Sequence, residues 1–165
     1  MAKFIGQSST KGISYISFPK FAEIKQQVSE EQYQIIQCLG LSGIGKSRLM
    51  FEIFKDLDNA NNYYCQNASD ERLINELSSF LHENNESCII VLDNCNGDAF
   101  SKICSLRLEI DSSYKIIGIY NDPESVVRQS GVNQLFLKRR DLVDSVNQYV
   151  SQEIGQVGEQ AESIV

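Results

Sequence analysis

Eight consecutive residues have the composition and spacing of a loop that binds phosphate. Residues 40–47 are Gly-Leu-Ser-Gly-Ile-Gly-Lys-Ser, which matches the pattern G-x-x-x-x-G-K-[ST] at every fixed position. Glycines let a turn bring backbone N–H groups close to phosphate oxygens, and the start of a helix adds further donors. We expect Lys46 to contact the β- and γ-phosphates and the Ser47 hydroxyl to ligate Mg²⁺. The predicted nucleotide-binding residues of this segment are Gly40, Ser42, Gly43, Ile44, Gly45, Lys46, Ser47 and Arg48.

A carboxylate follows a second apolar run. Asp93 comes directly after residues 89–92, Ile-Ile-Val-Leu, and the ends of such strands face the ligand crevice of a parallel sheet. We expect Asp93 to hold a water on the Mg²⁺ that Ser47 ligates, unless it only caps the following helix. The next residue, Asn94, stands where many ATPases have a glutamate that orients the attacking water. An amide cannot take a proton, so we predict slow hydrolysis, or a base from elsewhere.

Two further groups are candidates by position alone. Asn121 follows the apolar run at 114–120 and could reach a γ-phosphate through water; equally, it could form an Asx turn before Pro123. An arginine finger, which would more readily act between subunits, could come from Arg128, Arg139 or Arg140.

Alternating strand and helix patterns position these residues. Apolar runs typical of strands cover residues 33–39, 62–66, 88–93, 114–120 and 134–138. Helical stripes follow Pro19, residue 46, Ser69, residue 97, Asp122 and Asp141, with Ser69 and Asp141 as expected N-caps. This alternation predicts an α/β fold, a three-layer P-loop NTPase with a five-stranded, mainly parallel sheet. We expect an N-terminal arm at 1–18, the core at 19–153, and a tail or linker at 154–165.

Composition and charge narrow the classes of partner. A net charge of -7 argues against a protein that coats duplex DNA, because phosphate neutralisation dominates such binding. No apolar run approaches the roughly 20 residues of a membrane span, and the N-terminus lacks a signal-peptide pattern. We therefore expect a cytoplasmic protein without a membrane or nucleic-acid partner.

The order of the patterns favours one branch of P-loop NTPases. An extra strand, residues 62–66, lies between the phosphate loop and Asp93, as in the additional-strand ATPases. Guanine specificity has no support, since residues 93–96 lack the glycine of D-x-x-G and residues 121–124 lack the lysine of N-K-x-D.

Four segments resemble the NTPase core of STAND proteins, the signal-transducing ATPases that include NLR-type immune receptors and bacterial anti-phage sensors. They are CLGLSGIGKSRLMFEIF (38–54), CIIVLDNC (88–95), YKIIGIYND (114–122) and QLFLKRRDLVDSVNQYV (134–150). The resemblance implies ATP or ADP with Mg²⁺ as cofactors, and Asp93 as the Walker B residue. Asn94 departs from the family's second acid, residues 120–122 lack its threonine-arginine sensor, and no Gly-x-Pro lid motif occurs.

These observations predict a signalling switch. ATP or ADP binding would bias contacts with flanking domains absent from this chain, or with further copies in a homo-oligomer formed on activation. The alternatives are a small P-loop kinase and a nucleotide-binding scaffold without turnover.

Overall fold

The computed structural model describes residues 3–5, 21–30, 32–55, 62–84, 87–109, 114–122, 126, 131–141, 143 and 151. In chain order its elements are β1 (Lys3–Ile5), α1 (Phe21–Ser29), β2 (Ile35–Leu39), α2 (Lys46–Lys55), β3 (Tyr63–Cys65), α3 (Glu71–Glu83), β4 (Ile89–Leu92), α4 (Gly97–Glu109), β5 (Lys115–Ile119) and β6 (Asn133–Phe136). Strands and helices alternate from α1 to β5, as the sequence predicted. The helix expected after Asp122 falls largely on residues outside the described set, and so does Pro19.

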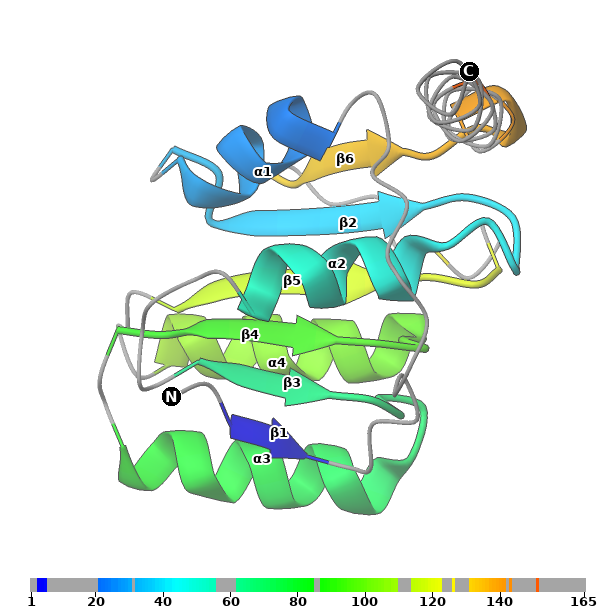
Figure 1. Ribbon diagram of the computed structural model, residues 1–165. Coiled ribbons are helices and arrows are strands. Elements are labelled where there is room, and N and C mark those ends of the chain that lie inside the picture. Colours follow the sequence, from blue (N-terminus) through cyan, green and yellow to red (C-terminus); the bar gives the residue numbers. More distant parts are fainter. Residues whose placement is uncertain are drawn as a thin grey trace, which may run out of the picture.

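The strands form one sheet in the order β1-β3-β4-β5-β2-β6, and every pairing is parallel (Figure 1). All five predicted strands are present. A sixth, β1, adds an edge strand that pairs with β3, and it lies within the segment expected to be an arm. The prediction of five strands was therefore one short, because a three-residue strand in a polar segment is too brief to show a period of two.

Helices cover both faces of the sheet. In β3, Tyr63 and Cys65 pack in the cluster that contains the buried residues of α3 and α4, whereas Tyr64 packs with those of α1 and α2. Figure 1 shows α2 in front of the sheet and α4 behind it. The result is a three-layer α/β arrangement, and burial on both faces explains why the strands are nearly continuous apolar runs.

Two helices begin differently from the sequence prediction. The N-cap of α3 is Asp70, whose side chain accepts from the Arg72 backbone N–H at 2.9 Å, and not Ser69. Asp141 is not an N-cap either, because residues 139–141 are already helical and its carboxylate accepts from the Lys138 N–H at 2.7 Å. In both cases two polar residues lie near the start of the helix, and their spacing in the sequence does not show which one is the N-cap.

The strand order determines what lies near the phosphate-loop candidate. Since all strands run in parallel, the segments that follow β2, β4 and β5 emerge at one edge of the sheet. β5 lies between β2 and β4, so the turn after β2 and the residue after β4 are separated by one strand. Among the described residues, no helix is both long and apolar enough to cross a bilayer.

Candidate functional site

The turn between β2 and α2 has a conformation that requires glycine. Gly43 and Gly45 have φ values of 79° and 92°, in the left-handed region that other residues rarely adopt. Gly40 meets a different constraint, because a Cβ there would lie 2.6 Å from the Leu137 carbonyl oxygen. The glycines therefore allow both a tight turn and close contact with the chain leaving β6.

Lys46 folds back over this turn. Its Nζ donates to the carbonyl oxygens of Gly40 and Leu41, each at 2.8 Å, and the residue is only 2% exposed. Burial lowers the pKa of Lys46, because desolvation disfavours the ammonium form. The ammonium group is thus held at the turn by two neutral acceptors, with its third N–H still available to an anion.

Ser47 and Asp93 are in direct contact. The Ser47 hydroxyl, in the first turn of α2, donates to Asp93 Oδ1 at 2.7 Å, although β5 separates β2 from β4 in the sheet. The two residues that the sequence assigned to a metal are therefore brought together. A hydroxyl that donates its hydrogen keeps oxygen lone pairs, so Ser47 can hold this contact and ligate a cation at the same time.

Asp93 is 9% exposed and accepts two more hydrogen bonds. The Asn94 backbone N–H donates to Oδ1 at 2.8 Å, and the Tyr64 hydroxyl donates to Oδ2 at 2.9 Å. Burial, reinforced by the Asp93 carboxylate, raises the pKa of Tyr64, so its hydroxyl remains a donor. Tyr64 was not predicted as a site residue; the available signal was a pair of adjacent tyrosines in a buried strand, where a phenol needs a partner.

Asn94 is tied to three polar neighbours. Its φ is 52°, a left-handed conformation that asparagine tolerates better than most residues. The side-chain Nδ2 donates to Asn67 Oδ1 at 3.0 Å and to Ser69 Oγ at 3.1 Å, and Oδ1 accepts from Asn121 Nδ2 at 3.2 Å. These contacts hold the Asn94 side chain against the surrounding loops, and it has no group that can take a proton from a water.

The other predicted residues contribute in different ways. The Ile44 side chain is buried in the core, which leaves its backbone for a ligand, whereas Ser42 is exposed. Arg48 pairs with Glu52 at 2.6 Å, so its side chain contacts α2. Arg139 and Arg140 are exposed beyond β6, and Arg128 lies outside the described residues.

The donor set suits Mg²⁺ bound together with phosphate. The Ser47 hydroxyl and the Asp93 carboxylate are hard oxygen donors, and Mg²⁺ typically combines one or two such groups with waters and substrate phosphates. Within the part of the chain that the structure describes, no group of three or more His, Cys, Asp or Glu residues could hold a metal. The Ser47 and Asp93 oxygens fit a metal whose other ligands are waters and phosphate oxygens.

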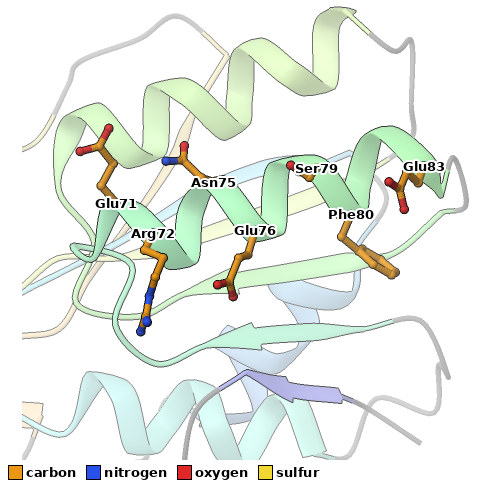
Figure 2. Close-up of a pocket in the computed structure, with 7 residues that line it drawn as sticks. All are labelled: Glu71, Arg72, Asn75, Glu76, Ser79, Phe80 and Glu83. Atoms are coloured by element: carbon orange, nitrogen blue, oxygen red, sulfur yellow. The ribbon is translucent and has the colours of Figure 1, made fainter.

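A broad concavity of about 780 Å³ lies elsewhere, along α3 between Glu71 and Glu83 (Figure 2). Among the described residues, its lining side chains all come from that one helix, and none of them is a predicted site residue. A smaller cavity of about 350 Å³ is lined by Ser69 and Asn96, beside the Asn94 contacts. The polar groups that converge from several strand ends are those around Asp93, and we take these as the candidate site.

No family model and no curated protein matches the chain. The side chains around Asp93 are therefore the basis on which a function can be assigned.

Proposed function

We propose that this chain is a P-loop domain that binds ATP or ADP with Mg²⁺ and acts as a slowly hydrolysing signalling switch, of the kind found in STAND-like sensors. The contact that carries this proposal is the 2.7 Å hydrogen bond between Ser47 and Asp93. It joins the hydroxyl that ends the glycine turn to a carboxylate 46 residues away.

The additional-strand branch was inferred from the strand at 62–66. That strand is β3, which comes between β2 and β4 in the chain and pairs with β4. In the sheet a different strand, β5, lies between β2 and β4. Asp93 nevertheless reaches Ser47, because both lie just beyond the carboxyl ends of their strands.

Each residue has a distinct part in this proposal. Backbone N–H groups at the start of α2 and the Lys46 ammonium would bind the phosphates, for which Lys46 would exchange a carbonyl contact for a phosphate oxygen. Ser47 would ligate Mg²⁺ and Asp93 would accept a hydrogen bond from a metal-bound water. Bound Mg²⁺ would neutralise charge that develops on the phosphates.

Turnover should be slow because the site offers no base beside Asp93. Asn94 has no basic group, and its amide nitrogen already donates to the loop that holds Asn67 and Ser69. The same observation favours a second candidate function, a scaffold that holds nucleotide without hydrolysing it. In the switch, nucleotide state alters contacts with flanking domains or other copies; in the scaffold, occupancy alone matters.

Calorimetry and phosphate release test the proposal together. We expect Mg²⁺-dependent binding of ATP or ADP by the purified chain, and slow phosphate release that a candidate acceptor does not accelerate. Binding without release would favour the scaffold. Transfer of phosphate to an acceptor would make the domain a kinase, and absence of any nucleotide binding would refute the proposal as a whole.

Asn94→Glu should raise the rate of phosphate release. A glutamate at this position adds a carboxylate that can accept the proton of the attacking water, and a positioned base typically contributes about 100-fold or more. Because the left-handed backbone at residue 94 opposes a longer side chain, we expect about 10-fold or more. Asn94→Gln is the matched control, since it has the same length and backbone demand without the carboxylate. Equal rates in both variants, with nucleotide binding intact, would show that residue 94 does not occupy the base position.

A further inference from the structure

Tyr64 connects three elements beneath the candidate site. The residue belongs to β3 and is 2% exposed. Its ring makes edge-to-face contacts with Phe51 and Phe54 of α2, with ring centroids 6.1 and 5.5 Å apart. These contacts fix the ring, so the place of its hydroxyl is set by packing and does not depend on a ligand.

The fixed hydroxyl meets one oxygen of Asp93. It donates to Oδ2 at 2.9 Å, and the Ser47 carbonyl oxygen lies 3.2 Å away from it. A carboxylate attracts the hydrogen more strongly than a neutral carbonyl does. Tyr64 therefore holds one oxygen of Asp93 while the Ser47 hydroxyl holds the other, Oδ1.

The number of acceptor positions left on Asp93 is small. An ionised carboxylate offers about four lone-pair sites. Ser47 and the Asn94 backbone occupy two at Oδ1, and Tyr64 occupies one at Oδ2. About one position remains, which is enough for a metal-bound water or one metal–oxygen bond, but not for chelation through both oxygens.

We propose that Tyr64 is a positioning residue that fixes the orientation of Asp93 and leaves a single acceptor position on its Oδ2, and that it thereby makes the site select Mg²⁺ over Ca²⁺. Mg²⁺ has a strict octahedral shell, keeps several waters and binds few carboxylate oxygens. Ca²⁺ takes six to eight oxygens in looser geometry and readily accepts a bidentate carboxylate. This inference rests on the proposed nucleotide site and adds its metal specificity.

Tyr64→Phe tests the inference, with Tyr114→Phe as the matched control. Tyr114 is also fully buried, and its hydroxyl lies near two carbonyl oxygens, of Leu81 at 2.9 Å and Asn84 at 2.8 Å. Tyr114 directly precedes β5, at the amino ends of the strands, whereas Asp93 lies at their carboxyl ends. Both variants remove one buried phenol hydroxyl and keep the ring, so a loss of stability alone affects both.

The measurement is calorimetric binding of ATP at a series of Mg²⁺ or Ca²⁺ concentrations. We expect Tyr64→Phe to raise the Mg²⁺ concentration that gives half-saturation of ATP binding by about tenfold. This is the lower end of what outer-sphere partners of metal ligands contribute. The Mg²⁺-to-Ca²⁺ preference should fall with it, while Tyr114→Phe keeps the wild-type preference.

Several outcomes would overturn the inference. Equal behaviour of the two variants is one, and a wild-type chain that binds both metals equally well is another, independent of any variant. If the wild-type chain bound no nucleotide with either metal, the proposed function itself would fail; nucleotide binding with unchanged metal preference in Tyr64→Phe would leave that function intact.

Discussion

Lys46→Met should abolish Mg-nucleotide binding while the melting temperature of the empty protein stays nearly unchanged. The substitution keeps the aliphatic stem, which suits a residue that is 2% exposed, and removes the ammonium group. Loss of a charged partner from a desolvated site typically costs about 2–5 kcal/mol, so we expect affinity to fall by at least about 30-fold. The empty protein loses hydrogen bonds to the carbonyls of Gly40 and Leu41, but it also no longer buries an ammonium group that desolvation disfavours, so the two effects on its stability oppose each other.

Calorimetry with ATP and ADP, paired with thermal melting without nucleotide, separates the two effects. Lys102→Met is a suitable control, because Lys102 is an exposed lysine of α4 whose Nζ contacts Asn75 and no site residue. Undiminished affinity in Lys46→Met would remove Lys46 from the site. A large drop in melting temperature would instead show that its contacts hold the turn together.

Local sequence patterns were sufficient to predict the features that depend on a single turn or a single strand end. The glycine spacing predicted the turn before α2, and the apolar run before Asp93 predicted a buried strand. The 2.7 Å contact between Ser47 and Asp93 follows from the parallel sheet, because parallel strands place the ends of β2 and β4 at one edge. The order of the strands, with β5 between the two, is a property of the whole sheet and no local pattern encodes it.

The contacts that the sequence did not reveal involve partners from separate elements. Tyr64 belongs to β3, and its hydroxyl contacts Asp93 beyond β4 and the carbonyl of Ser47 in α2. A strand pattern indicates that such a tyrosine is buried but not which polar group it meets. Likewise, Asn94 was expected to face a water, but its amide is engaged by Asn67, Ser69 and Asn121, from two other loops.

The second buried lysine is expected to behave in the opposite way to Lys46. Lys115 begins β5 and is 7% exposed. Its Nζ donates to the carbonyl oxygens of Val28 and Glu30, at 2.5 and 2.6 Å, where α1 ends. A cation at the C-terminal end of a helix satisfies carbonyls that have no partner within the helix and interacts favourably with the helix dipole.

Lys115→Met should therefore lower the free energy of unfolding by about 2–4 kcal/mol, because hydrogen bonds from a charged donor contribute roughly 1.5–3 kcal/mol each and are not fully additive. Chemical denaturation measures this loss, and calorimetry on the folded variant should show nearly wild-type nucleotide affinity. The reason is position: Lys115 lies at the amino end of its strand, whereas Asp93 and Ser47 lie beyond the carboxyl ends of theirs. A loss of less than about 1 kcal/mol would mean that water replaces the ammonium at the end of α1. Weakened nucleotide binding in a stable Lys115→Met protein would mean that the two edges of the sheet are coupled.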